Sequence, residues 1–331
     1  MTPSTLQKRQ PRYQRTKEIN FRLQERDIEI IKEVYRYRFL NSAHIKALIP
    51  GSDQRITRRL NTLFHAGYLD RPKSQRQIRN EKMVYALGNK GAELLASQLD
   101  FNLPATDWTS KNRESGMTYL EHTLMVANFI IMVKLACDEC DGLTFIEPEG
   151  IINHRPQYAK DTEPETGWRI EAQGDNGKYS IGMIPDYVFG IYDEQARRTF
   201  YYFLEADRST MPIKRKDHRK SSFYKKLVGY YETFQQGHFF TFWGFKAARV
   251  LTLTVSKPRL SSMIEANQTL NGQGSNIFLF APEDVFNLDE PTQVFNRHWI
   301  NGEGRRVSLL DSKNRHAIIN QHGELMFSSS E

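Results

Sequence analysis

The chain has 331 residues, 39% of them hydrophobic and 12% aromatic, so it is long enough for two domains and lacks the composition of a disordered protein. No apolar run approaches the ~20 residues of a membrane helix, and the N-terminus is polar and basic, so we expect a cytoplasmic protein without membrane span or export signal. Two cysteines, Cys137 and Cys140, exclude a disulfide-stapled fold and, without a second pair, do not predict a zinc site.

The charge of the chain is segregated along its length. Residues 1–100 contain 20 lysines and arginines against 10 aspartates and glutamates, whereas the remaining residues contain 26 against 29. A basic excess confined to the first third favours a partner that carries phosphates over a surface that is merely solubilising. We therefore expect double-stranded DNA as the partner.

The first hundred residues predict a winged helix-turn-helix. Residues 1–20 are basic and poor in apolar side chains, as in a flexible arm. Over 21–100 the apolar residues recur first at helical spacing and later at strand spacing, with cap residues at the breaks. The expected elements are helices within 23–40, 41–49, 52–66 and 89–99 and strands within 67–71 and 82–88. A polar segment, 101–115, is expected as a connector.

Basic side chains occur where such a domain contacts DNA. Arg55, Arg58 and Arg59 lie at positions i, i+3 and i+4 of the third helix, so they share the face opposite its apolar residues. A recognition helix uses such a face to reach phosphates and guanine edges in the major groove. The candidates in the wing are Arg71, Lys73, Arg76, Arg79 and Lys82. The alternative is that this helix contacts protein.

Residues 116–283 predict an α/β domain with a mixed sheet, which makes the whole chain α+β. A long helix within 114–139 is apolar nearly all round and is expected to be buried, and 154–178 is interpreted as loops and turns. Strands are expected at 182–192, 198–207, 249–256 and 276–281, and helices at 219–237 and 258–271. Residues 284–331 are expected to form a small β extension.

Three carboxylates lie on the two strands that pair first in this domain. Asp186 is near the start of one strand and Glu205 near the end of the next, so antiparallel pairing places them side by side. Asp207 shares the face of Glu205 because side chains alternate along a strand. Such carboxylates repel one another unless a metal ion or a basic residue lies among them. Without a metal, they would form ion pairs with Arg208 or the basic residues that follow.

These segments resemble a known superfamily. The helix "YLEHTLMVANFIIMVKL", the strands "IPDYVFGI" and "YYFLEADRST", the helix "YKKLVGYYE" and the strand "VLTLTVS" resemble the core of the PD-(D/E)XK, restriction-endonuclease-like proteins. With a winged helix in front, residues 24–256 resemble the replication-relaxation proteins of plasmids and other mobile elements, and more distantly the MobC-type relaxases.

The resemblance implies that Asp186 and Glu205 bind Mg²⁺ or Mn²⁺ and that Asp207 and a lysine assist. Position 207, where the superfamily usually has its lysine, is an aspartate here, and Lys226 on the following helix is the best replacement. Looser alternatives for that lysine are Lys214, Lys216 and Lys220, and Glu121 or His122 could add a ligand from the long helix. Tyr224, Tyr230 and Tyr231 would be nucleophiles only if the protein formed a covalent link to DNA, and we expect them in the core or a groove.

The implied function is metal-dependent nicking or relaxation of DNA at an origin-like site of a plasmid or mobile element. The alternatives are a catalytically inactive, nuclease-like regulator of plasmid replication or transcription, and a nuclease of a transposition or defence system. Homodimerisation or contact with other DNA-processing proteins is left open by the sequence.

Overall fold

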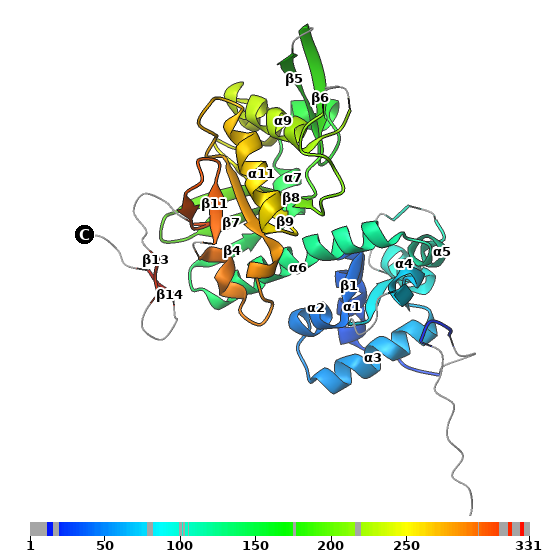
Figure 1. Cartoon of the computed structure of the whole chain (residues 1–331). Coiled ribbons are helices and arrows are strands. Elements are labelled where there is room, and N and C mark those ends of the chain that lie inside the picture. The colour runs from blue at the N-terminus through cyan, green and yellow to red at the C-terminus, as the bar shows by residue number, and fades with distance from the viewer. Residues whose placement is uncertain are drawn as a thin grey trace, which may run out of the picture. The chain divides into compact units, whose positions relative to one another are not determined.

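The computed structural model divides into two compact units, Met1–Asn128 and Phe129–Glu331, and their boundary falls inside one helix, α6 (Met117–Glu139) (Figure 1). The residues described are 12–15, 20–77, 82–98, 101, 103–104, 106–174, 177–215, 220–296 and 298–310, together with the two short strands β13 (Ala317–Ile319) and β14 (Leu325–Phe327). The expected α+β class is confirmed.

The first unit has the element order of a winged helix-turn-helix. Its elements are α1 (Glu25–Tyr37), β1 (Phe39–Asn41), α2 (Ser42–Leu48), α3 (Asp53–Ala66), β2 (Leu69–Asp70), η1 (Lys73–Gln77), β3 (Val84–Leu87), α4 (Asn89–Gln98), α5 (Trp108–Arg113) and the first half of α6. The strands form an antiparallel sheet in the order β1-β3-β2.

The predicted helices of this unit form for the reasons that the sequence gives. Both α1 and α3 bury apolar residues spaced three and four apart, among them Ile30, Val34, Ile56 and Leu60. Gly67 ends α3 with a φ of 89°, in the left-handed region that residues with a side chain rarely adopt. The segment expected as a connector contains α5, whose Trp108 is buried, so it belongs to the packed unit.

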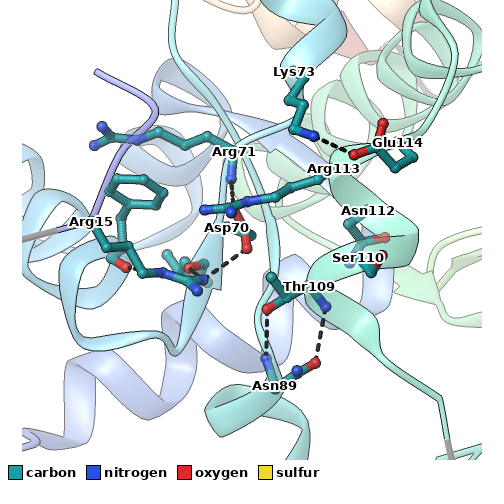
Figure 2. A network of polar contacts seen from close by, with 12 residues as sticks. Arg15, Asp70, Arg71, Lys73, Asn89, Thr109, Ser110, Asn112, Arg113 and Glu114 are labelled. Atoms are coloured by element: carbon teal, nitrogen blue, oxygen red, sulfur yellow. Dashed lines mark hydrogen bonds and ion pairs between the residues drawn. The ribbon is translucent and has the colours of Figure 1, made fainter. Parts of the chain in front are cut away.

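Buried aspartates tie distant parts of this unit together. Asp70 Oδ2 accepts a hydrogen bond from Arg15 Nη2 at 2.8 Å, and Asp70 Oδ1 accepts one from Arg113 Nε at 2.8 Å (Figure 2). Asp27 is likewise buried and accepts from Arg59 Nε at 2.8 Å. These arginines therefore hold the fold, since a guanidinium that is paired with a buried carboxylate cannot be removed without leaving that charge unpaired.

The second unit is built on a mixed seven-stranded sheet in the order β12-β11-β10-β9-β8-β7-β4. Its strands are β4 (Leu143–Ile146), β7 (Tyr187–Asp193), β8 (Arg198–Asp207), β9 (Arg249–Thr254), β10 (Phe278–Pro282), β11 (Trp299–Asn301) and β12 (Arg306–Val307). The three strands β8, β9 and β10 are parallel, and the other pairs are antiparallel. The expected C-terminal extension thus begins by widening this same sheet.

Helices accompany the sheet of the second unit. They are α7 (Pro148–Asn153), α8 (Gln157–Thr162), α9 (Phe223–Gln235), α10 (His238–Trp243) and α11 (Lys257–Gln268), with short 3-10 turns η2 (Glu283–Val285) and η3 (Pro291–Phe295). Because β8 and β9 are parallel, α9 and α10 carry the chain from Asp207, at the end of β8, back to Arg249, which pairs with Tyr202.

Part of the segment interpreted as loops and turns is a β-hairpin, β5 (Trp168–Gly174) with β6 (Gly177–Met183), so that interpretation was wrong. Alternate residues of β5 are buried, beginning with Trp168 and Ile170. The hairpin packs on α9, where a Cβ added to Gly229 would lie 2.2 Å from Met183 Sδ. A side chain at this position would require Met183 to move away from the helix.

Over the described residues, one helix, α6, is long and apolar enough to cross a membrane by length and composition. Of its most apolar window, 61% is buried inside the structure, and buried core helices pass the same test. The expected burial of this helix is confirmed from Met125 to Val133 apart from the half-buried Asn128.

Candidate functional site

The register of β7 and β8 places Asp186 opposite Glu205. Tyr187 pairs with Leu204, and the Asp186 N–H, one residue before β7, donates to the Leu204 carbonyl at 3.0 Å. Asp186 Oδ2 in turn accepts from the Ala206 N–H at 2.8 Å, which holds the carboxylate beside the end of β8. The two carboxylates are therefore neighbours across the ladder, as the antiparallel pairing predicted.

Two side chains from α9 bind the Glu205 carboxylate, which is only 3% exposed. Tyr230 donates its hydroxyl proton to Glu205 Oε1 at 2.6 Å, and the Lys226 ammonium forms an ion pair with Oε2. Lys226 and Tyr230 are four residues apart, so they project from the same face of the helix. We call Asp186, Glu205, Lys226 and Tyr230 the carboxylate–lysine cluster.

The cluster alters the protonation of its members. Burial raises the pKa of Glu205, and the nearby Asp186 adds to that effect while Lys226 opposes it. Burial alone would lower the pKa of Lys226, but the charges of Glu205 and Asp186 outweigh it, so the pKa is raised and the ammonium stays charged. Burial, and then Glu205, raise the pKa of Tyr230 well above its usual value, so the phenol is a fixed proton donor and a poor nucleophile.

Asp207 has a different partner from the rest. Arg259, on α11, donates from Nε and Nη2 to the two oxygens of Asp207, each at 2.9 Å. The Ser209 N–H adds a third bond, to Oδ2, at 3.0 Å. Such a bidentate guanidinium pair satisfies a carboxylate and fixes its plane. We therefore remove Asp207 from the residues expected to assist a metal and assign it to the junction between β8 and α11.

The alternative lysines are not in the cluster. Lys214 donates to Thr269 Oγ1 at 3.0 Å, Lys220 is exposed, and Lys216 lies outside the described residues. Glu121 and His122 belong to the first unit, whereas the cluster belongs to the second. Among the sequence candidates, Lys226 is the lysine that the structure brings to Glu205.

The donor set fits a hard divalent cation. No group of three or more His, Cys, Asp or Glu side chains suited to a metal occurs in the part of the chain that the structure describes. Mg²⁺ nevertheless needs only one or two carboxylates, because waters and substrate phosphates supply the remaining ligands. Asp186 and Glu205 provide two, and each Glu205 oxygen keeps a lone pair beyond the one that accepts from Lys226 or Tyr230.

The basic residues of the first unit divide into exposed and structural ones. Arg55 and Arg58 of α3 are exposed, whereas Arg59 is paired with Asp27. In the wing, Lys73 forms an exposed ion pair with Glu114 and Arg76 lies 4.8 Å from the centre of the Tyr13 ring. Lys82 is exposed, and Arg79 lies outside the described residues.

Arg71, a candidate for DNA contact in the wing, is not on an open surface. It is 6% exposed, and its guanidinium carbon lies 4.0 Å from the centre of the Phe64 ring. Its Nη2 donates to Asn61 Oδ1 at 3.1 Å and to the Tyr85 hydroxyl at 3.3 Å. These contacts make it a fixed link between α3 and β3.

A family model described as replication-relaxation matches residues 31–241, which is more than half of the chain. The chain belongs to the replication-relaxation family. Membership assigns it a role in the replication or relaxation of plasmid or other mobile-element DNA. Comparison with curated proteins and with solved structures gives no match.

Two residues of this replication-relaxation protein were missed as partners of the carboxylates. Tyr230 was expected in the core or a groove, or as a nucleophile if the protein formed a covalent link to DNA, although its position four residues after Lys226 places both on one helix face. Arg259 gives no comparable signal, because it is 52 residues from Asp207 along the chain and meets it only through the parallel pairing of β8 with β9.

Proposed function

We propose that this protein binds duplex DNA through its first unit and cleaves one strand by metal-dependent hydrolysis in its second. The observation that carries the proposal is the carboxylate–lysine cluster, in which Asp186 and Glu205 face each other and Lys226 contacts Glu205. Its setting in a family concerned with replication and relaxation of DNA makes a phosphodiester the substrate to test first.

The chain order of the second unit supports a nuclease. A helix, three antiparallel strands, a helix and a further parallel strand occur in this order as α6, β4, β7, β8, α9 and β9, which is the core order of the PD-(D/E)XK proteins. The helices α7 and α8 and the β5–β6 hairpin are inserted after β4, and α10 is inserted after α9. Asp186 then stands at the first acidic position and Glu205 at the second, and Lys226 supplies from α9 the charge that Asp207 does not.

Each side chain has a distinct task in this proposal. Asp186 and Glu205 hold Mg²⁺ or Mn²⁺, and the metal, when bound, supplies Lewis-acid stabilisation and a water of lowered pKa. The charged Lys226 ammonium stabilises the additional negative charge that develops on the phosphoryl oxygens during attack. Tyr230 holds one oxygen of Glu205, so the carboxylate presents a fixed orientation.

DNA binding is proposed for the exposed basic residues of the first unit. On α3 these are Arg55 and Arg58, and in the wing they are Lys73, Arg76 and Lys82. Arginines and lysines in such positions neutralise phosphates, which supplies most of the affinity for duplex DNA and makes it fall steeply with salt.

The test is nicking of a supercoiled plasmid that carries the DNA next to the protein's own gene, with Mg²⁺ or Mn²⁺ present. We expect nicking by the wild type, its loss in Asp186→Asn, and its retention in Glu194→Gln, which alters an exposed carboxylate just after the same strand. Binding of the same DNA should weaken in an Arg55→Ala, Arg58→Ala double variant. Nicking that survives in Asp186→Asn would refute the assigned site.

A second function, DNA binding without cleavage, is favoured by one observation. Both oxygens of Glu205 already have protein partners, which is also how a carboxylate serves a purely structural role. Under this alternative the protein regulates replication or transcription, and the plasmid assay gives binding that depends on Arg55 and Arg58 but no nicking by any variant.

A further inference from the structure

A cavity of about 510 Å³ opens in the first unit between the recognition helix α3 and the wing strand β3. Its lining residues are Arg12, Thr57, Arg58, Asn61, Arg71, Met83 and Tyr85. Three of these are arginines and none is acidic, so the cavity is strongly electropositive. We call it the α3–β3 pocket.

The pocket contains a preformed donor set. Arg71 lines the pocket, and its contacts with Phe64, Asn61 and Tyr85 hold its guanidinium in a fixed orientation. Its Nε is buried and makes no hydrogen bond within the described part of the chain. A buried donor without a protein partner is rare, and the oxygen of a water or of a ligand would satisfy it.

The volume and the lining of the α3–β3 pocket suit a ligand that is larger than a single phosphate ion. Binding pockets for small molecules commonly have volumes of roughly 300–1,000 Å³. Tyr85 and Met83 provide an apolar wall, whereas Arg58 and Asn61 provide donors at the rim on α3. A ligand that carries both a ring and a phosphate fits these two parts of the pocket. Its ring packs on the apolar wall, and its phosphate binds the guanidinium groups.

We propose that the α3–β3 pocket binds one nucleotide unit, with its phosphate on Arg12, Arg58 and Arg71 and its sugar or base against Tyr85 and Met83. The source is a strand of DNA lying across α3 and the wing, or a free mononucleotide. The first source rests on the proposed DNA binding of this unit. The pocket thus contributes a defined contact in addition to the open basic surface.

The test uses Asn61→Asp in the full-length protein. The new carboxylate keeps the acceptor for Arg71 Nη2, so the fold is retained, while it places a negative charge in the pocket. Gln54→Glu is the matched control, because it makes the same change of charge on an exposed position of α3 that does not line the pocket.

Two titrations are made at several salt concentrations: a fluorescent 30-base-pair duplex by anisotropy, and dAMP by calorimetry. For DNA as the source, we expect Asn61→Asp to weaken duplex binding about tenfold more than Gln54→Glu, the loss that one charge-assisted contact brings. For a free nucleotide, we expect dAMP binding by the wild type that Asn61→Asp abolishes, with duplex binding equal in both variants.

Equal duplex affinity in the two variants, together with no dAMP binding that depends on Asn61, would overturn the proposal while leaving DNA binding by the unit intact. A wild type that binds no duplex at all would instead contradict the proposed function, and the dAMP titration would still decide whether the pocket takes a nucleotide.

Discussion

Asp70 in the first unit and Glu205 in the second are both buried carboxylates, at 0% and 3% exposure, but they have different partners. Asp70 lies between two guanidinium groups, those of Arg15 and Arg113, and also accepts the Arg71 N–H at 2.8 Å. Glu205 lies between an ammonium and a phenol, with a second carboxylate, Asp186, across the ladder.

The different partners indicate that one buried carboxylate, Asp70, stabilises the fold, whereas the other, Glu205, is placed for chemistry. A guanidinium remains protonated at all relevant pH values, and two of them hold Asp70, one at each oxygen. Lys226 and Tyr230 each make a single contact with Glu205, and such contacts can be exchanged for contacts with a ligand. Asp207, which is locked by Arg259, follows the first pattern although it is two residues from Glu205.

Among the changes proposed here, Asp70→Asn should lower the free energy of unfolding the most. The amide cannot neutralise Arg15 and Arg113, and removing one partner of a buried ion pair costs roughly 3–5 kcal/mol. We expect a fall of that size in the free energy of unfolding, measured by urea denaturation followed by circular dichroism. The control is Asp53→Asn, which breaks the exposed pair with Lys46 and should cost less than about 1 kcal/mol. Equal effects of the two changes would show that Asp70 is not a structural centre.

Lys226→Met tests whether the surroundings of Glu205 serve a chemical reaction. If the ammonium stabilises charge on the reacting phosphate, its loss should lower the rate of plasmid nicking about 100-fold, or roughly 2.7 kcal/mol of barrier. Lys225→Met is the control, because this neighbouring side chain lies over the Tyr179 ring, 6.0 Å from its centre. A nicking rate that is unchanged in Lys226→Met would assign the lysine to the fold.

The stability of the protein should depend on pH differently in the wild type and in Glu205→Gln. A raised pKa means that the folded state binds the Glu205 proton more tightly than the unfolded chain does, so stability falls as pH rises above the ordinary value of 4.5. We therefore expect Glu205→Gln to gain stability relative to the wild type between pH 4 and pH 7, by at most about 1.4 kcal/mol per pH unit. Urea denaturation at both pH values measures the difference, and a change of opposite sign would show that Lys226 dominates the site.

Tyr230→Phe should have the smallest effect. The change removes one hydrogen bond to Glu205 and leaves the ring in place, which costs about 1 kcal/mol of unfolding free energy. If Tyr230 positions Glu205 for a metal, the Mn²⁺ affinity of the protein, measured by calorimetry, should also fall. Tyr231→Phe on the same helix should leave that affinity unchanged, and an equal fall there would exclude the positioning role.

Much of the fold followed from the sequence because local patterns specify it. The apolar spacing of α1 and α3, the glycine that ends α3 and the alternating strands β7 and β8 are all visible in the chain. The hairpin β5–β6 was missed although Trp168 and Ile170 alternate with polar residues, because polar and glycine-rich turns around it outweighed a short pattern. Its burial depends on α9, which lies far along the chain.

The candidate site was predictable only in part. Pairing of two strands fixed Asp186 beside Glu205, and helical spacing selected Lys226. The neutralisation of Asp207 by Arg259 and the burial of Arg71 depend on contacts between residues that no local period connects. An arginine in a basic segment has the same appearance in sequence whether it faces DNA or a buried acceptor.

Helix α6 has a practical consequence for dissecting the protein. Its Leu120 packs in the core of the first unit with Phe39 and Val84, whereas its Phe129 packs at an angle against the rings of Phe286 and Trp299 in the second. If the chain is cut before α6, the amino-terminal fragment lacks the part of the helix that completes its core. If it is cut after α6, the carboxyl-terminal fragment lacks the part that completes its own. Fragments meant to fold separately should therefore overlap, each carrying its own copy of residues 117–139.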